Sequence, residues 1–362
     1  MKNHTIPQKL KVAVGLSGGV DSSVAAVLLK EQGYEVTGVF MQCWDARADG
    51  CKADEDRVYA VKTAAKLGIK FEHLDYRDPY KAKVMEYFLR EYRVGRTPNP
   101  DVTCNKEIKF GLFFDWALKK GFDYVATGHY ARVYKNKSGC RLLKGTDPKK
   151  DQSYFLYLLG QKQLAKTLFP VGNLTKSEVR KVAQNKKLPA AERPESMGIC
   201  FIGEVNIKDF LKKYIPIKIG KVLSVDGEVI GEHDGVWFYT VGQRHGFKLK
   251  KYFGKALYVA AKNIDENELV VGGEKDVRSV SFCVNDIHWI SKDFSLPSGG
   301  LECSVRIRHL GKIYRCAVSK VTQKTGDEKL QVKLARAVFA VASGQSAVFY
   351  KGQVVLGGGI IA

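Results

Sequence analysis

The chain has 362 residues, of which 45% are hydrophobic and 27% are charged. These proportions exclude a disordered, collagen-like or membrane-spanning chain, and the length favours two or three domains. The 59 Lys and Arg residues outnumber the 38 Asp and Glu residues, which gives a net charge of +21. An excess of this size favours an anionic partner, most often nucleic acid or a membrane surface.

The positive charge is concentrated in two parts of the chain. Residues 106–187 carry 18 Lys and Arg against 6 Asp and Glu, a net charge of +12, and residues 281–362 carry +6. Residues 1–105 and 188–280 are nearly neutral, at +2 and +1. Scattered lysines usually form a solvated surface, but two separate clusters favour a long polyanion as the partner.

Cysteine usage and the absence of targeting segments indicate the compartment. The eight cysteines form no CxxC pair and no Cys/His spacing typical of zinc, so we expect no metal site. The N-terminus lacks the apolar core of a signal peptide, and no apolar run reaches the roughly 20 residues of a membrane span. The sequence therefore predicts a cytoplasmic protein, without membrane contact, whose thiols are reduced and available for chemistry.

Hydrophobic periodicity divides the chain into an α/β part and a β-rich part. Strands are predicted at 11–16, 35–41, 70–74 and 124–128, and helices at 21–30, 55–67, 79–92 and 105–120. This alternation predicts a parallel, Rossmann-like α/β sheet. From residue 220 onward, short alternating runs predict a small β-rich domain and then a C-terminal β-barrel. We therefore expect three domains, at 1–205, 206–275 and 276–362.

The most informative short motif is SGGVDS, at residues 17–22, between the first predicted strand and helix. Its glycines let the backbone close around an anion, and the helix that follows directs free N–H groups at a phosphate. Asp21 would repel a phosphate, so we expect it to contact Mg²⁺ or to begin the helix. The loop lacks the Lys of a Walker motif. A Gly-rich turn without a ligand is the alternative.

Two cysteines are candidates for chemistry. GRTPNPDVTCNKEIKFG, residues 95–111, places Asp101 and Cys104 three residues apart on a Pro-rich loop that enters a helix. A thiol near a helix start and close to Lys106 is expected to have a lowered pKa. A buried structural thiol is the more common alternative. Cys200, within ESMGICFIGE, would by itself be assigned to the core.

Several segments resemble known families. The SGGVDS loop resembles the PP-loop of ATP pyrophosphatases, which cleave ATP between the α and β phosphates. Longer segments resemble the bacterial tRNA-specific 2-thiouridylase family over nearly the whole chain, among them GLSGGVDSSVAA, GVFMQCWD, GRTPNPDVTCNKEIKFG, ATGHYAR, KDQSYFLY, GICFIGE, YTVGQRHG and SGQSAVFY. The departures are mild. The segment RIRHLGKIYR differs from the family's usual Arg-Tyr dipeptide, so Arg308 and His309 are the expected equivalents. Cys51 has no assigned role.

The resemblance implies ATP-dependent sulfur transfer to the wobble uridine of tRNA, with Mg²⁺ as an expected cofactor. It implies that Cys200 carries the sulfur as a persulfide, that Cys104 releases it and forms a disulfide with Cys200, and that Asp101 is the general acid or base. It implies that Met41 and Gly128 lie near the adenine and ribose. The loop residues that it assigns to ATP are Gly15, Leu16, Ser17, Gly18, Gly19, Val20, Asp21 and Ser22.

The resemblance also implies partners and tRNA contacts. The partners are a tRNA with a modifiable wobble uridine, and a sulfur-relay protein or cysteine desulfurase as persulfide donor. The expected contacts are Asn99, Pro100 and Asp101 around the target base, and His129, Lys150, Asp151, Gln152, Arg308, His309 and Gln345 elsewhere. Catalysis is thus expected within residues 1–105 together with Cys200, and RNA binding in the two basic segments.

Three other functions would each account for part of these features. Another PP-loop tRNA enzyme, such as a lysidine synthetase or a 4-thiouridine synthetase, would share the loop, but a lysidine synthetase needs no cysteine pair. A small-molecule amidotransferase gives no reason for the +12 segment. An RNA-binding protein without catalysis gives no reason for an intact loop and two candidate thiols.

Overall fold

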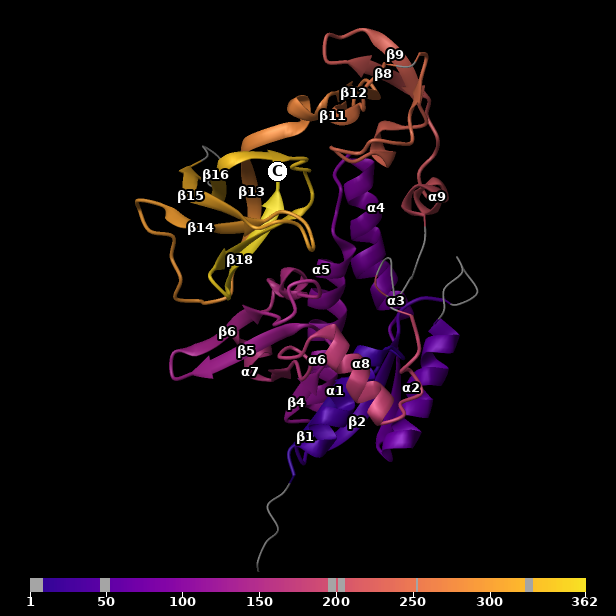
Figure 1. The fold of residues 1–362 in the computed structure, drawn as a ribbon, viewed down its shortest axis with the longest axis vertical. Helices are drawn as coiled ribbons and strands as arrows, with labels where there is room; N and C mark the ends of the chain where they lie inside the picture. The colour runs from indigo at the N-terminus through magenta and orange to yellow at the C-terminus, as the bar shows by residue number, and fades with distance from the viewer. Residues whose placement is uncertain (1–8, 46–52, 195–199, 201–205, 252, 323–327) are drawn as a thin grey trace, which may run out of the picture. The chain divides into compact units, whose positions relative to one another are not determined.

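The computed structural model describes all residues except 1–8, 46–52, 195–199, 201–205, 252 and 323–327 (Figure 1). The chain forms two compact units. The first comprises Met1–Lys81, Asp101–Glu204 and Gln353–Val355, and the second Ala82–Pro100, Val205–Gly352 and Leu356–Ala362. Among the described residues, no helix combines the length and the apolar character that crossing a membrane requires.

The first unit contains a five-stranded parallel sheet in the order β3-β2-β1-β4-β7. The strands are β1 (Lys11–Gly15), β2 (Glu35–Gln42), β3 (Lys70–Asp75), β4 (Tyr124–Ala126) and β7 (Thr167–Leu168). The strand order reverses at β1, and parallel sheets of this kind bind ligands at the carboxyl ends of the strands beside the reversal. The predicted parallel α/β domain is confirmed.

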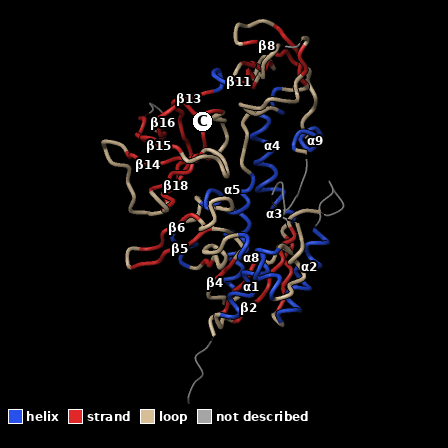
Figure 2. Tube along the Cα trace, viewed as in Figure 1, coloured by secondary structure: helices blue, strands red, loops and turns tan. Residues whose placement is uncertain are grey.

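Helices pack around this sheet (Figure 2). They are α1 (Val20–Glu31), α2 (Ala53–Leu67), α6 (Phe113–Lys119), α7 (Gln161–Ala165) and α8 (Lys176–Asn185). Helix α1 buries Leu29 in a cluster with Val12 of β1, and Val24 in a second cluster with Val179 of α8. A helix that is apolar on both sides is held in the core. The loop that precedes α1 is therefore anchored by a rigid element.

Two predicted helices differ from the observed ones. The helix expected at 79–92 is divided into α3 (Arg77–Tyr80), a π-helical turn η1 (Lys81–Met85) and α4 (Glu86–Arg93). The helix expected at 105–120 begins earlier, as α5 (Pro100–Cys104), because proline fits the first turn, where its missing N–H needs no partner. It continues as a π-helical segment, η2 (Asn105–Leu112), before α6.

The π-helical segment η2 has a local cause. The N–H of Phe113 donates to the carbonyl of Ile108, five residues back, which is the π-helical spacing. A Cβ on Gly111 would lie 2.8 Å from the carbonyl oxygen of Lys106. Glycine therefore permits the wide turn. Because α5 begins at Pro100, before η2, Asp101 and Cys104 lie within a helix rather than on the loop that the sequence predicts.

A β-hairpin completes the first unit. Strands β5 (Ala131–Asn136) and β6 (Gly139–Lys144) pair in antiparallel fashion, and β6 also pairs with Val354 and Val355 of the same unit. A 3-10 turn, η3 (Ser153–Leu156), follows the hairpin. This part of the unit lies within the basic segment, residues 106–187.

The second unit contains a mixed sheet in the order β10-β9-β8-β12-β11. Strands β8 and β12 run parallel, and the other pairs are antiparallel. The elements are α9 (Ile207–Lys212), β8 (Gly220–Ser224), β9 (Val229–His233), η4 (Val236–Phe238), β10 (Lys248–Leu249), β11 (Tyr258–Asn263), β12 (Glu268–Gly272) and η5 (Glu274–Val277). The predicted β-rich central part is confirmed.

Six antiparallel strands close into a barrel in the order β13-β16-β15-β14-β17-β18, with β18 paired to β13; apart from Val354 and Val355, they belong to the second unit. The interior contains Val284, Val305 and Phe349, all fully buried. The pairing of β18 with β13 joins the two ends of this sheet, as the predicted barrel requires. The strands are β13 (Arg278–Trp289), β14 (Leu301–Arg306), β15 (Tyr314–Thr322), β16 (Glu328–Phe339), β17 (Ser346–Lys351) and β18 (Val354–Ile361).

Barrel closure depends on a close approach at Gly357, whose φ is +152°. A Cβ at this position would lie 2.1 Å from the carbonyl oxygen of His288. We expect Gly357→Ala to lower the free energy of unfolding by about 2–4 kcal/mol, because the backbone is strained and β18 is pushed from β13. Urea denaturation, with hydrogen exchange of β13 and β18, measures the loss.

Gly352→Ala is the matched control. Its φ of +60° is also left-handed, but no atom lies within 4 Å of the added Cβ. The cost should therefore be about 1 kcal/mol. Equal losses for the two variants would contradict the role assigned to Gly357.

Candidate active site

The predicted phosphate loop lies between β1 and α1. Gly18 has a φ of +76°, and a Cβ there would lie 2.2 Å from the carbonyl oxygen of Asp56, so only glycine fits. The Ser22 hydroxyl donates to the carbonyl of Gly19 at 3.1 Å and lies 3.2 Å from the Ser17 hydroxyl. The N-cap Gly19 supplies no side-chain acceptor to the first turn of α1. The loop therefore presents N–H groups suited to an anion.

The other residues predicted for ATP lie against this loop. A Cβ on Gly128, just after β4, would lie 2.6 Å from the Ser22 nitrogen. A Cβ on Gly15 would lie 3.1 Å from the Met41 methyl carbon. Gly128, Gly15 and Met41 thus stand close to the loop, at the carboxyl ends of adjacent strands. This is the position where the strand order predicts a ligand.

Asp21 has partners that sequence reasoning missed. The Lys176 ammonium lies 2.6 Å and 2.8 Å from its carboxylate oxygens, and the Tyr130 hydroxyl donates to it at 2.7 Å. Arg193 donates to the carbonyl of Gly18 at 3.0 Å and to Asp56 at 2.8 Å. Two cations far along the chain therefore hold the loop. The sequence offered one sign that Lys176 is unusual: it is a cation at the first position of a helix, directly after the N-cap residue Thr175.

The two predicted thiols lie together in the first unit. Cys104 is fully buried at the end of α5, and Cys200 is partly buried; neither is in a disulfide. Their side chains share a hydrogen bond. The Lys109 ammonium donates to the Cys200 sulfur at 3.2 Å. The structure therefore brings the two predicted thiols together, and their joint action stays a prediction.

The main chain of Cys200 is also fixed. Its N–H donates to the Asp101 carboxylate at 2.9 Å, and its carbonyl accepts from the Tyr80 hydroxyl at 2.7 Å. Tyr80 was not predicted from the sequence, where a buried tyrosine on a helix gives no functional signal. Burial, opposed by the Cys200 N–H and by Lys109, raises the pKa of Asp101. A carboxyl group with a raised pKa suits the predicted acid–base role.

The two thiols differ in acidity. The hydrogen bond from Cys104, and then the charge of Lys109, lower the pKa of Cys200 to about 7 against the effect of burial. Burial, followed by the hydrogen bond to Cys200, raises the pKa of Cys104 well above its usual value. The lowered pKa predicted for Cys104 is therefore wrong. Lys106 is exposed and pairs with Glu107 at 3.4 Å.

Lys109 is the main residue of this site that sequence reasoning missed. It lies five residues after Cys104, about 140° away on an α-helix at 100° per residue. The π-helical segment η2, capped by Cys104, turns less per residue and brings Lys109 toward the same side. Among the described residues, no cluster of three or more His, Cys, Asp and Glu could hold a metal ion.

The tRNA contacts predicted in the first unit have different environments. Lys150 is partly buried, and Gln152 accepts from the Tyr130 N–H at 3.0 Å. Asp151 is buried and accepts from the N–H groups of Gly145 and Ser153 at 3.0 and 3.1 Å. The Asp151 carboxylate thus shapes the loop. His129 is also buried, with Nδ1 2.7 Å from the Thr127 hydroxyl; burial and Lys109 lower its pKa.

The remaining predicted contacts lie in the second unit, apart from Asp101. Gln345 donates to the carbonyls of Thr97 and Pro98 at 3.0 and 3.3 Å, and so holds the segment that leads to Asn99 and Pro100. Arg308 and His309 follow β14, with Arg308 exposed. Cys51 lies outside the described residues.

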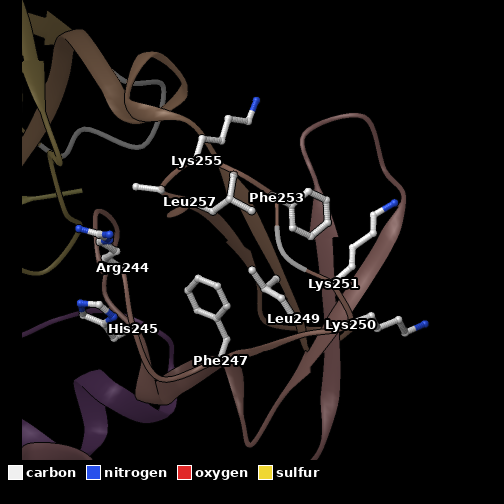
Figure 3. A pocket seen from close by; sticks show the side chains of 10 residues that line it. Arg244, His245, Phe247, Leu249, Lys250, Lys251, Phe253, Lys255 and Leu257 are labelled. Atoms are coloured by element: carbon white, nitrogen blue, oxygen red, sulfur yellow. The ribbon is translucent and has the colours of Figure 1, made fainter.

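A surface pocket of about 510 Å³ lies in the second unit, within residues 244–257 (Figure 3). The rings of Phe247 and Phe253 and the side chain of Leu249 surround it, and Lys250 and Lys251 extend outward. Residues 244–257 contain five Lys or Arg and no Asp or Glu. The net charge of +1 over residues 188–280 concealed this basic and aromatic stretch.

Comparisons with known proteins cover nearly the whole chain. Three family models match in succession: the tRNA methyl transferase HUP domain at residues 10–204, the tRNA methyl transferase PRC-barrel domain at 208–273, and the aminomethyltransferase beta-barrel domain at 279–361. The tRNA-specific 2-thiouridylase MnmA of Bacillus velezensis is 45% identical over 361 residues, 98% of this chain and 95% of the relative. The chain belongs to the tRNA-specific 2-thiouridylase family.

Other relatives were also found. The tRNA-specific 2-thiouridylase MnmA of Stutzerimonas stutzeri is 45% identical over 369 residues, 98% of this chain and 95% of the relative. A solved U34-tRNA thiolase from Methanococcus maripaludis is 20% identical, covers 57% of this chain and 67% of its own, and has a TM-score of 0.37. That likeness is too low for an inference, so membership of the 2-thiouridylase family rests on the two sequence relatives.

Exposure and acidity predict which thiol of this 2-thiouridylase family member reacts first. Cys200 is partly exposed with a pKa of about 7, whereas Cys104 is buried and protonated. With substoichiometric iodoacetamide at pH 7.5, we expect Cys200 to be alkylated at least about tenfold faster than Cys104. Peptide mass spectrometry over a time course measures both rates.

The partly buried Cys140 is the matched control: Lys135 acts on it electrostatically, but among the described residues no lysine donates a hydrogen bond to its sulfur as Lys109 does to Cys200. It should react more slowly than Cys200. Faster alkylation of Cys104 than of Cys200 would contradict the assignment.

Proposed function

We propose that the chain is an ATP-dependent tRNA-uridine 2-sulfurtransferase. It adenylates O2 of the wobble uridine and replaces that oxygen by sulfur, yielding 2-thiouridine, AMP and pyrophosphate. The observation that carries this proposal is the pair of hydrogen-bonded thiols, one acidic and one buried, in the unit that contains the phosphate loop. The name of the two sequence relatives implies sulfur transfer, which needs a nucleophilic sulfur. The methyl transfer in the names of the family models does not need one.

ATP supplies the leaving group. The C2 carbonyl of uracil is a poor electrophile because its oxygen leaves badly, and adenylation makes that oxygen part of AMP. We propose that residues 15–22 hold the pyrophosphate, with Met41 and Gly128 near the nucleoside. Mg²⁺ commonly binds through one or two carboxylates and the substrate phosphates, and Asp21 is the carboxylate within residues 15–22. When bound, Mg²⁺ would neutralise phosphate charge.

Sulfur transfer uses the two thiols in sequence. The outer sulfur of a Cys200 persulfide attacks C2, and AMP leaves with the former O2. The Cys104 thiolate then attacks the Cys200 sulfur, and the S–S bond to the tRNA breaks. The tRNA sulfur leaves with the electron pair, so 2-thiouridine is released and a Cys104–Cys200 disulfide remains. An external thiol reductant restores the enzyme. The hydrogen bond between the thiols supports this pairing.

We propose that tRNA binds through the two basic segments. The proposed contacts are Asn99, Pro100 and Asp101 at the target base, and Lys150, Gln152, Arg308, His309 and Gln345 elsewhere. His129 and Asp151 would act by shaping their loops, because both side chains are buried. The basic and aromatic pocket of residues 244–257 adds a surface on which an unpaired base can stack.

The partners and the compartment are also proposals. A sulfur-relay protein or a cysteine desulfurase would load Cys200, since it is the less buried of the two thiols. Reduction of the disulfide in each cycle fits the cytoplasm. We keep the division into domains at 1–205, 206–275 and 276–362 as the functional one, with ATP chemistry in the first.

Thiol variants test the order of sulfur transfer. We expect Cys200→Ser to reduce thiolation of an unmodified tRNA transcript by about 10³-fold or more, because the nucleophile is lost. Cys104→Ser should still form pyrophosphate, but should accumulate a protein–tRNA adduct that dithiothreitol releases. Gel electrophoresis and pyrophosphate release, with a cysteine desulfurase as sulfur source, measure both steps.

Cys140→Ser is the thiol control and should retain activity. Asp21→Ala tests the loop and should abolish pyrophosphate release, with Asp115→Ala as an exposed control carboxylate. Full thiolation by Cys200→Ser, or loss of pyrophosphate release in Cys104→Ser, would refute this division of labour.

Salt dependence tests the RNA surface. Each lysine–phosphate contact contributes about −0.7 to −0.9 to the slope of log affinity against log salt. We expect Lys250→Ala combined with Lys251→Ala to reduce the slope for tRNA by about 1–2 and to weaken binding. Fluorescence anisotropy between about 50 and 300 mM salt, where the log–log dependence is linear, measures the slope and the affinity.

Lys221→Ala combined with Lys320→Ala is the matched control, because Glu268 and Glu328 already pair with these lysines. Its slope should change little. An unchanged slope in the Lys250 and Lys251 variant would remove the pocket from the RNA surface.

A further inference from the structure

We propose that Lys109 is a positioning residue that serves the two thiols in turn: it holds the Cys200 sulfur first, and then favours the thiolate of Cys104 once Cys200 has been consumed. This inference rests on the proposed sulfur transfer and goes beyond it, because it assigns the order of the two steps to one cation. None of the family resemblances assigns a role to this residue.

The geometry places one cation against two sulfurs. The Lys109 ammonium lies 3.2 Å from the Cys200 sulfur, and Cys104 shares a hydrogen bond with the same sulfur. Lys109 lies on η2, which Cys104 caps, so both side chains come from one stretch of helix. The titratable groups that face this cluster are Cys43, Tyr80, Asp101, Cys104, His129 and Cys200.

Lys109 stays charged in this environment. Burial opposes its ammonium, but the thiol groups of Cys200 and Cys104, and then Asp101, raise its pKa above the usual value. His129 is kept neutral by burial and by Lys109 itself. Burial, and then repulsion by Cys200, raise the pKa of Cys43. Lys109 is thus the cation of the cluster, and its charge acts on whichever sulfur is ionised.

In the resting state that sulfur is Cys200. The S–H group of Cys104 donates a hydrogen bond to the Cys200 sulfur and keeps its proton. Lys109 stabilises the thiolate form of Cys200. Cys104 is held protonated by burial and by the presence of the Cys200 charge. Only one of the two sulfurs is therefore nucleophilic before sulfur is loaded.

Loading and transfer reverse this preference. Once the Cys200 sulfur is bonded to the transferred sulfur and through it to C2 of the uridine, it no longer carries a negative charge. The repulsion that kept Cys104 protonated is removed, while Lys109 remains and lowers the pKa of Cys104. The Cys104 proton passes to the released 2-thiouracil, and the disulfide forms. The order of the steps thus follows from charge.

Thiolate absorbance at 240 nm tests the inference on the full-length, reduced protein without tRNA or ATP. The first ionisation in the wild-type titration reports the Cys200 thiolate, because the pKa of Cys104 lies far above it, and its midpoint should be near pH 7. Lys109→Met should raise that midpoint by about one to three pH units, and Lys109→Arg should restore most of the shift. A residue that only filled space would not move the midpoint.

The same measurement in the Cys200→Ala background reports Cys104. Its midpoint should be lower than in the wild type, and Lys109→Met should raise it again. Should Lys109→Met fail to fold by circular dichroism, Lys109→Gln replaces it. An unchanged Cys200 midpoint in a folded neutral variant would overturn the inference. Because no substrate is present, that result leaves the proposed sulfur transfer to be judged by the thiolation assay.

Discussion

The chemistry of this chain depends on one cation, the Lys109 ammonium, placed against a pair of sulfurs that share a proton. Two adjacent thiols of equal acidity would compete as nucleophiles. Burial of Cys104 and the position of Lys109 beside Cys200 remove that symmetry. The helix α5, the segment η2 and the main-chain contacts of Cys200 all serve to maintain this unequal pair.

The nucleotide loop and the thiol pair are connected through two consecutive residues. Gly128 packs against Ser22 of the loop, and His129, the next residue, faces Lys109. Both follow β4, beside the reversal of strand order. An open parallel sheet brings the ends of its central strands to one region, so a single strand end can contact both reagents. The sequence predicts catalytic residues outside the basic segments. Lys109 departs from that expectation, because it belongs to the basic segment 106–187.

Local signals explain what could be predicted from the sequence. The loop at residues 17–22, the alternation of strands and helices and the barrel depend on neighbouring residues, and all were recovered. Lys176 was missed because its partner Asp21 lies 155 residues away. Lys109 was missed because π-helical spacing is not visible in an α-helical pattern. Asp151 was predicted to contact tRNA because its motif resembles one of the family. Nothing in the sequence indicates that its carboxylate is buried and accepts a hydrogen bond from the Gly145 N–H.

The tethers on Cys200 have a mechanical consequence. Asp101 holds its N–H and Tyr80 holds its carbonyl, so both ends of its peptide framework are fixed. The remaining freedom is rotation about the Cα–Cβ bond, which has three staggered positions. A sulfur attached there moves on an arc of a few ångströms while the chain around it stays in place. Under the proposed function, rotation about the side-chain bonds alone would carry the outer sulfur of a Cys200 persulfide between the donor and the uridine.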